Sequence, residues 1–135
     1  MKPTLLTLAL LATALPAAAQ DSPLDPVRQP PQVNVERLDY GLQARRLADG
    51  VWVVEGSNAD FSVANGCNII NTGFISTGAG VLVINTGTSK TYGEQLRALI
   101  RRTTTEPVVQ VIHLNLHPDY FLGNQAFADV PRLAT

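Results

Sequence analysis

The sequence predicts an α/β fold, which some schemes class as α+β, with a mixed β-sheet covered by helices. A strand–helix–strand unit spans residues 81–114, a glycine-rich turn at 77–80 joins its first strand to the one before, and a β-branched and aromatic strand lies at 51–55. Strands joined through a helix form a right-handed parallel crossover. A tight hairpin, by contrast, makes its strands antiparallel, so the sheet is expected to be mixed.

Two turns, at 48–50 and 77–80, separate the first predicted strands. The folded part is expected to begin near Leu42, and a turn at 48–50 precedes the strand Val51–Glu55. After a polar loop, Asn68–Ser76 and Val81–Asn85 are predicted as strands joined by the glycine-rich turn, whose glycines permit positive φ. The second of these strands is apolar without alternation, which is typical of a strand covered on both faces.

A helix is predicted next, with Thr91 and Glu94 forming a capping box at its start. Four apolar residues recur at three- and four-residue intervals on one side of this helix: Tyr92, Leu96, Leu99 and Ile100. The segment 103–107 ends the helix at a proline. Val108–Leu114 is then a second apolar strand, and a further helix is expected at Phe121–Phe127.

Residues 1–19 are predicted to be a signal peptide. Lys2 supplies a positive start, residues 5–15 are almost purely apolar, and Ala17–Ala19 form a small-residue cleavage site. The apolar stretch is shorter than the roughly 20 residues that a membrane span needs. We therefore expect cleavage after Ala19, a periplasmic or secreted product, and no membrane association after cleavage.

Two further segments follow the predicted signal peptide. Residues 20–41 contain four prolines among polar side chains, a composition that predicts a disordered linker. Residues 42–135 then form the folded domain. Because Cys67 is the only cysteine, no internal disulfide is possible, and we interpret it as a small buried hydrophobe.

The net charge excludes some classes of partner. The formal charge is only −1, and the chain has no run of basic residues. Nothing therefore directs it electrostatically to nucleic acid or to an anionic membrane surface. A small molecule or another protein is the expected partner.

Polar side chains that suit metal chemistry follow the last predicted strand. Ligands of open α/β sheets bind beyond the carboxyl ends of the strands. Alternate side chains of an extended segment point the same way, so Asn115, His117 and Asp119 can converge. Imidazole and carboxylate are zinc ligands.

His117 could instead be a surface histidine and Asp119 a helix N-cap. His113 is four residues from His117, roughly 13 Å in an extended chain, and is interpreted as a strand histidine near a core edge.

This segment resembles the metallo-β-lactamase superfamily, whose motif is His-x-His-x-Asp-His within a four-layer αββα fold. The resemblance runs from about Leu47 to Phe127 and includes the Trp52 strand, the segment Val81–Gly87 and the tail Leu122–Phe127. The sequence is most similar to exported zinc metallohydrolases associated with quinoprotein dehydrogenase systems. The resemblance implies the N-terminal half of the αββα fold and Zn²⁺ as the cofactor.

The resemblance also assigns roles to individual residues. His117 matches a first-site zinc ligand and Asp119 a second-site ligand, and both would serve in catalysis. Asn115 and Tyr120 stand where the family has histidines, and Asn85 replaces an aspartate that supports the site from behind. The family's other ligands come from later segments. The resemblance therefore implies a truncated domain with an incomplete ligand set.

An incomplete ligand set weakens the expected chemistry. A catalytic zinc ordinarily takes three protein ligands and one water. His117 and Asp119 supply two, because the amide of Asn115 is a poor donor and Tyr120 binds zinc well only after it loses its phenolic proton. Unless zinc is held, the pKa of water is not lowered toward neutrality. Single-zinc lactamases share Asn-x-His-x-Asp, however, so later ligands could restore a site.

Three functions follow as hypotheses. The leading one is an exported zinc-dependent hydrolase, impaired or inactive as this chain, with an unknown small-molecule substrate. The alternatives are a non-catalytic periplasmic accessory protein for a quinoprotein dehydrogenase, and a gene fragment without function. In all three the sheet has only one covering layer, which leaves apolar strand residues as candidates for exposure: Leu82, Ile84, Val109 and Val111.

Overall fold

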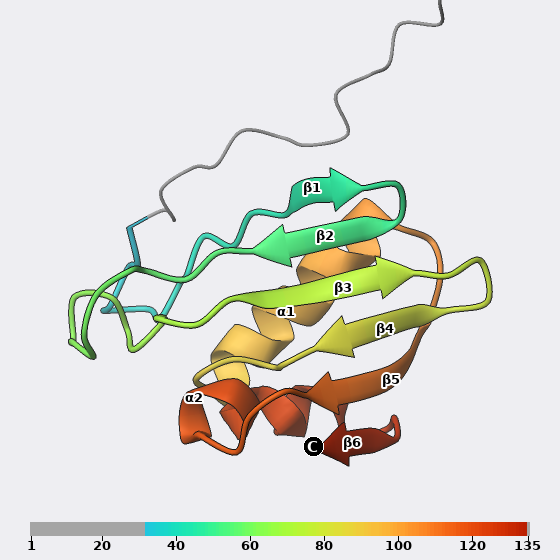
Figure 1. The fold of residues 1–135 in the computed structure, drawn as a ribbon. Helices are drawn as coiled ribbons and strands as arrows, with labels where there is room; N and C mark the ends of the chain where they lie inside the picture. Colours follow the sequence, from blue (N-terminus) through green and yellow to red (C-terminus); the bar gives the residue numbers. More distant parts are fainter. Residues whose placement is uncertain (1–31, 135) are drawn as a thin grey trace, which may run out of the picture.

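The computed structural model describes residues 32–134, which form a six-stranded sheet in chain order with helices on one face (Figure 1). The pairs β1–β2, β2–β3 and β3–β4 are antiparallel, whereas the pairs β4–β5 and β5–β6 are parallel. The predicted mixed sheet is confirmed. The strands are β1 Arg45–Ala48, β2 Val51–Val54, β3 Thr72–Ser76, β4 Val81–Ile84, β5 Val108–His113 and β6 Arg132–Ala134.

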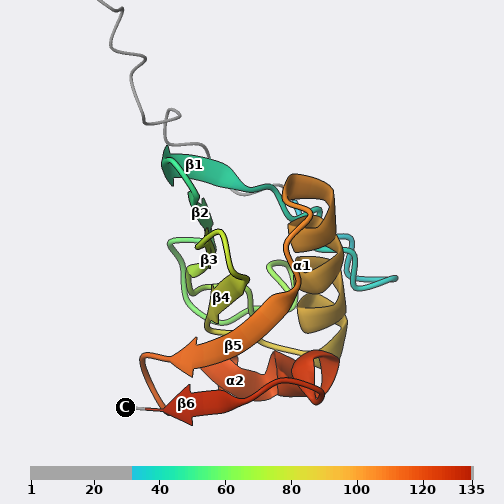
Figure 2. The ribbon, with the colours of Figure 1, turned by 90° about the vertical axis from the view of Figure 1, so that its right-hand side faces the viewer.

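Three helical segments complete the fold. Helix α1 (Lys90–Thr103) connects β4 to β5, and α2 (Pro118–Phe121) leads into the 3₁₀ helix η1 (Leu122–Phe127). Figure 2 shows α1 lying along one face of the sheet. Among the described residues, no helix has the length and apolar character that crossing a bilayer requires. The predicted signal peptide and residues 20–31 of the predicted linker lie outside the described part.

The core lies between α1 and the sheet face that it covers. Phe74 and Val83 are paired across β3 and β4, both are fully buried, and Trp52 stacks on Phe74 with ring centroids 5.0 Å apart. From α1, Leu96 and Ile100 are also fully buried. The predicted apolar side of the helix is therefore the one that packs on the sheet.

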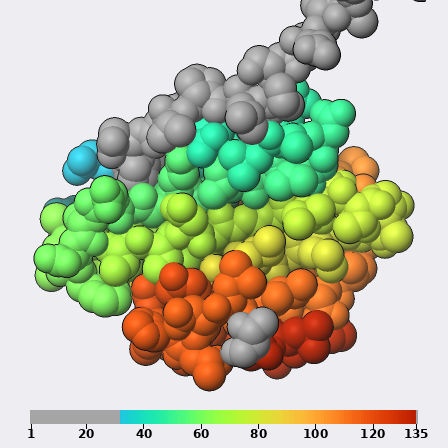
Figure 3. Space-filling view, in the orientation of Figure 1, coloured from blue at the N-terminus to red at the C-terminus, as the bar shows by residue number. Residues whose placement is uncertain are grey.

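The sheet face opposite to α1, which is turned toward the viewer in Figure 3, corrects two predictions. In β4, Val81 and Val83 are buried while Leu82 and Ile84 are half-buried, so this apolar strand is not fully covered on both faces. Of the four residues predicted as candidates for exposure, Val109 is exposed, but Val111 is fully buried. Its side chain faces α1 in register with Val83, a position that an unalternating run does not reveal.

The start of α1 also differs from the prediction. The N-cap is Ser89, whose hydroxyl accepts a hydrogen bond from the Tyr92 N–H at 3.0 Å, so the capping box proposed for Thr91 and Glu94 is wrong. Glu94 is exposed and lies 3.6 Å from Lys90, one turn earlier. The hydroxyl of Tyr40 lies 3.0 Å from the Ser89 hydroxyl, so a distant contact helps to fix where the helix begins.

The fold extends into the predicted linker. Tyr40 is only 1% exposed, packs edge-on against Tyr92 with ring centroids 5.1 Å apart, and donates its N–H to Gln95 at 2.9 Å. Leu38 and Tyr40 thus hold this segment to α1, and the packed part begins before Leu42. Proline content misled the prediction here, because a single buried tyrosine anchors the segment.

Several element boundaries differ as well. β1 and β6 were not predicted, and β3 begins at Thr72 rather than at Asn68. The helix predicted from Phe121 begins at Pro118 and continues as η1. β1 and β6 are short edge strands without an apolar pattern, so only their neighbours in the sheet define them.

Candidate functional site

The candidate ligands lie beyond the carboxyl end of β5, on the loop 114–117 and on α2 (Figure 1). β5 ends at His113 and α2 begins at Pro118. Proline suits the first turn of a helix, because it lacks the backbone N–H that would have no partner there. The extended run is therefore short. The expected alternation along one extended segment does not hold, because Asp119 lies on the helix.

Asp119 is the buried member of the group. It is 5% exposed, lies in the first turn of α2, and its Oδ1 has no hydrogen-bond partner within the described residues. A buried polar atom without a partner is unfavourable by about 1–3 kcal/mol, and more when the group is charged. Such an atom needs an explanation, and a metal ligand is one. The alternative role of Asp119 as N-cap is wrong, since His117 holds that position.

His117 and Asn115 are arranged differently. His117 is exposed, and its ring meets that of Tyr120 edge-on with centroids 6.5 Å apart. Its N–H donates to Asn115 Oδ1 at 2.9 Å, an Asx turn that shapes the loop. The Asn115 oxygen is thus engaged with the backbone at the position where the resemblance expects a histidine ligand.

Asn85 holds the start of the loop through a side-chain hydrogen bond. It is 2% exposed, its Oδ1 accepts the Leu114 N–H at 3.1 Å, and its Nδ2 donates to the Asn71 carbonyl at 3.3 Å. Its φ of 59° lies in the left-handed region, which asparagine tolerates better than most residues. Asn85 therefore fixes the point where the chain leaves β5 for the candidate site.

These residues do not provide a complete zinc site. Asp119 has an available oxygen and His117 an exposed imidazole, but within residues 32–134 no three His, Cys, Asp or Glu side chains form a group that could hold a metal. A catalytic zinc ordinarily needs three protein ligands. The donors present therefore suit part of a zinc site and do not complete one.

A buried polar network beneath the loop was not predicted. His113 is 4% exposed, and its Nε2 lies 2.9 Å from Asn124 Oδ1, which also accepts the Thr86 hydroxyl at 3.1 Å. Burial lowers the pKa of His113, which favours the neutral ring. The position of His113 agrees with the interpretation as a strand histidine. No local sequence pattern signalled the network, because its members come from separate segments.

Backbone contacts join this network to the neighbouring segment. The Thr86 N–H donates to the Tyr120 carbonyl at 2.8 Å, and the Gly123 N–H donates to the Gly87 carbonyl at 3.0 Å. A Cβ at Gly123 would lie 2.0 Å from the Thr86 oxygen, and one at Gly93 would lie 2.5 Å from the Gly123 oxygen. Glycine is therefore required where α1, η1 and the end of β4 meet, and this close packing positions Asp119.

Comparison with known proteins gives matches at the level of structure. Neither protein-family models nor curated protein sequences match the chain. A metallo-β-lactamase from Hirschia baltica matches with a TM-score of 0.57 and 22% identity over 70% of this chain and 43% of its own. FIM-1 from Pseudomonas aeruginosa, solved in a mono-zinc form, matches with a TM-score of 0.56 and 14% identity over 70% and 42%. An NDM_FIM-1-like metallo-β-lactamase from Erythrobacter litoralis, also mono-zinc, gives 0.54 and 22% over 70% and 44%. The chain spans less than half the length of these proteins, and the likeness is one of fold.

Proposed function

Because the chain has part of the metallo-β-lactamase fold, we propose that it is an exported relative of the zinc-dependent hydrolases whose zinc site is incomplete in this chain. One observation carries the proposal: Asp119 presents a buried oxygen without a partner next to a loop that supplies one imidazole, from His117. The site thus retains two donors of an ancestral metal centre. The chain by itself is impaired or inactive in hydrolysis.

The altered positions support this proposal. Zinc in such a site would activate water for hydrolysis, which requires that the metal be firmly held. Asn115 uses its oxygen to shape the loop, and Tyr120 would bind zinc well only as the phenolate. Neither replaces an imidazole. We therefore assign no catalytic step to the present side chains.

Export and the substrate class extend the proposal. The composition of residues 1–19 supports cleavage after Ala19 and a periplasmic or secreted location. The low net charge supports a small-molecule substrate rather than nucleic acid. N-terminal sequencing of the protein recovered from the periplasm tests export, and a first residue other than Gln20 or retention in the cytoplasm contradicts it.

Zinc titration of the purified protein tests the incomplete site. We expect weak zinc binding by the unmodified chain and an affinity about 100-fold higher in the double variant Asn115→His, Tyr120→His, because imidazole replaces a neutral amide and a phenol. The second variant, Asn115→Gln with Tyr120→Phe, is the matched control, since it changes both positions without adding a donor. Its affinity should stay at the unmodified level.

Two results of the zinc titration would contradict the proposal. Stoichiometric, tight zinc binding by the unmodified chain, lost in both His117→Ala and Asp119→Ala and accompanied by turnover of a chromogenic lactam, would mean that the site is complete and active. An equal rise of affinity in the control variant would show that the two histidines do not act as ligands.

A further inference from the structure

A groove lies between α1 and the segment that leads into β1. It has a volume of about 380 Å³, and seven residues line it: Asp39, Gly41, Leu42 and Gln43 from the segment before β1, and Gln95, Ala98 and Arg102 from α1. This size lies at the lower end of the range for small-molecule sites. No residue of the candidate metal centre takes part.

The wall of the groove is fixed by Gln95. Its Oε1 accepts the Tyr40 N–H at 2.9 Å, and its Nε2 donates to the Leu38 carbonyl at 2.8 Å, so both ends of the amide hold the segment to α1. Tyr40 and Leu42 are buried on either side of Gly41. Gly41 has a φ of 56°, a conformation that glycine adopts without strain. The groove is therefore preformed.

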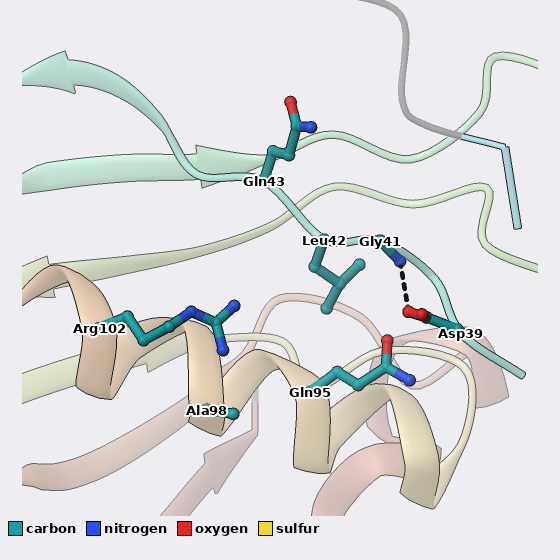
Figure 4. Close-up of a pocket in the computed structure, with 7 residues that line it drawn as sticks. All are labelled: Asp39, Gly41, Leu42, Gln43, Gln95, Ala98 and Arg102. Atoms are coloured by element: carbon teal, nitrogen blue, oxygen red, sulfur yellow. Dashed lines mark hydrogen bonds between the residues drawn. The ribbon is translucent and has the colours of Figure 1, made fainter.

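Two opposite charges lie at the ends of the groove (Figure 4). Figure 4 shows Arg102 at one end and Asp39 at the other, with Leu42 and Ala98 between them and Gln43 directed away from the helix. Asp39 uses Oδ1 to accept the Gly41 N–H at 3.0 Å. Within residues 32–134, neither Asp39 nor Arg102 forms an ion pair.

We propose that this groove binds a small zwitterion of dipeptide size, with its carboxylate on Arg102, its ammonium group on Asp39 and an apolar side chain over Leu42 and Ala98. The guanidinium group offers a planar pair of donors that matches a carboxylate. Asp39 has a carboxylate oxygen left for an ammonium donor. A ligand with both charges satisfies both ends, whereas an anion alone leaves Asp39 without a cationic partner.

The fixed wall reduces the entropy that binding loses. The backbone of segment 39–42 is already held by Gln95 and by the buried Tyr40 and Leu42, so mainly the exposed side chains must be ordered around the ligand. A preformed site binds more tightly than one that orders on binding. Because the groove is shallow and partly exposed to water, we expect a dissociation constant near 1 mM, about −4 kcal/mol.

Nuclear magnetic resonance titration of the full chain with glycyl-L-leucine tests the proposal. Backbone shifts of residues 39–43 and of Ala98 should saturate. Acetylglycyl-leucine, which lacks the ammonium group, and glycyl-leucinamide, which lacks the carboxylate, should each bind about tenfold more weakly, as should the dipeptide to Arg102→Gln and Asp39→Asn. Arg101→Gln is the matched control, because Arg101 is also exposed but does not line this groove.

Three results would overturn the proposal. The first is the absence of saturable shifts in the groove at about 10 mM dipeptide, a concentration well above the expected dissociation constant. The second is equal binding of the blocked and unblocked dipeptides. The third is a loss in Arg101→Gln that equals the loss in Arg102→Gln. The zinc titration described above is unaffected by any of these results, so the two proposals succeed or fail separately.

Discussion

Two carboxylates lie beyond opposite ends of β5 and have contrasting surroundings. Before the strand, Glu106 accepts the Ser76 hydroxyl and the N–H groups of Thr77, Gly78 and Gly80, each N–H at 3.1 Å. After the strand, Asp119 is buried and its Oδ1 has no partner among the described residues.

The two carboxylates differ in how many hydrogen bonds the fold offers them. Glu106 closes the β3–β4 hairpin, because the turn directs its N–H groups at one carboxylate, and the Ser76 hydroxyl followed by these N–H groups lowers the Glu106 pKa. Asp119 stabilises nothing comparable, although its burial is unfavourable for a charged group. A buried carboxylate oxygen without a protein partner needs an explanation, and the donor role proposed for Asp119 is one.

The largest expected effect tests the packing that holds Asp119 in place. Gly123→Ala puts a Cβ against the backbone of Thr86, which cannot move without shifting β4, so the free energy of unfolding should fall by about 3 kcal/mol. Urea denaturation measures this change. Gly78→Ala is the control at the hairpin end: it has φ +84° but open space, so a loss of only about 1 kcal/mol is expected. Equal losses would show that backbone conformation, not close packing, decides both.

A smaller effect is expected at Asp119 itself. In metal-free protein, Asp119→Asn should raise the free energy of unfolding by about 1 kcal/mol. The charged, unsatisfied oxygen is unfavourable by about 1–3 kcal/mol, which exceeds the 0.3–1 kcal/mol that a carboxylate gains in the first turn of a helix. Thermal unfolding with a chelator present tests the sign. A destabilised variant would mean that Asp119 has a structural role like that of Glu106.

Glu106→Gln should act in the opposite direction and depend on pH. Glutamine replaces one acceptor oxygen with a donor, which faces the N–H groups of the hairpin, so the urea midpoint should fall at pH 7. The folded-state pKa of Glu106 is lowered, so its contribution is present above the unfolded value of about 4.3 and is lost as pH falls through the folded value. The difference between the variant and the unmodified chain should therefore shrink below about pH 4. A constant difference across pH would contradict this linkage.

His113 should produce the smallest effect, at a higher pH. Burial lowers its folded-state pKa, so its contribution to stability is present above the unfolded value of about 6.5 and is lost as pH falls through the folded value. Between about pH 7.5 and 5.5 the unmodified chain should lose stability that His113→Gln, which cannot titrate, retains. Identical pH profiles of the two proteins would contradict a lowered pKa.

Much of the sheet could be predicted from sequence because its central strands and α1 carry local patterns. The glycine-rich turn indicated a hairpin, the β4 run indicated a strand, and the spacing from Tyr92 to Ile100 indicated a helix with one apolar side. β1 and β6 could not be predicted in this way, because hydrogen bonding to the neighbouring strands defines where they begin and end. Ser89 was missed as N-cap because two overlapping capping patterns compete, and tertiary contact with Tyr40 favours the earlier one.

The candidate site was predictable as a set of residues but not as a geometry. His117 and Asp119 were identified from their type and their place after β5. Their different burial was not, because the chain turns into α2 at Pro118 and places one side chain inside and the other in solvent. The network of His113, Asn124 and Thr86 joins segments distant in sequence, and no local pattern reports such a contact.

By itself, the sequence determined the order of the central strands and α1, the mixed character of the sheet and the donor types after β5, because periodicity and turn chemistry are local. Only the tertiary structure decided that Tyr40 belongs to the core, that Gly123 must lack a side chain and that the Asp119 oxygen is left without a partner. Burial and hydrogen-bond satisfaction depend on which distant segments meet, and that is a property of the whole packed chain.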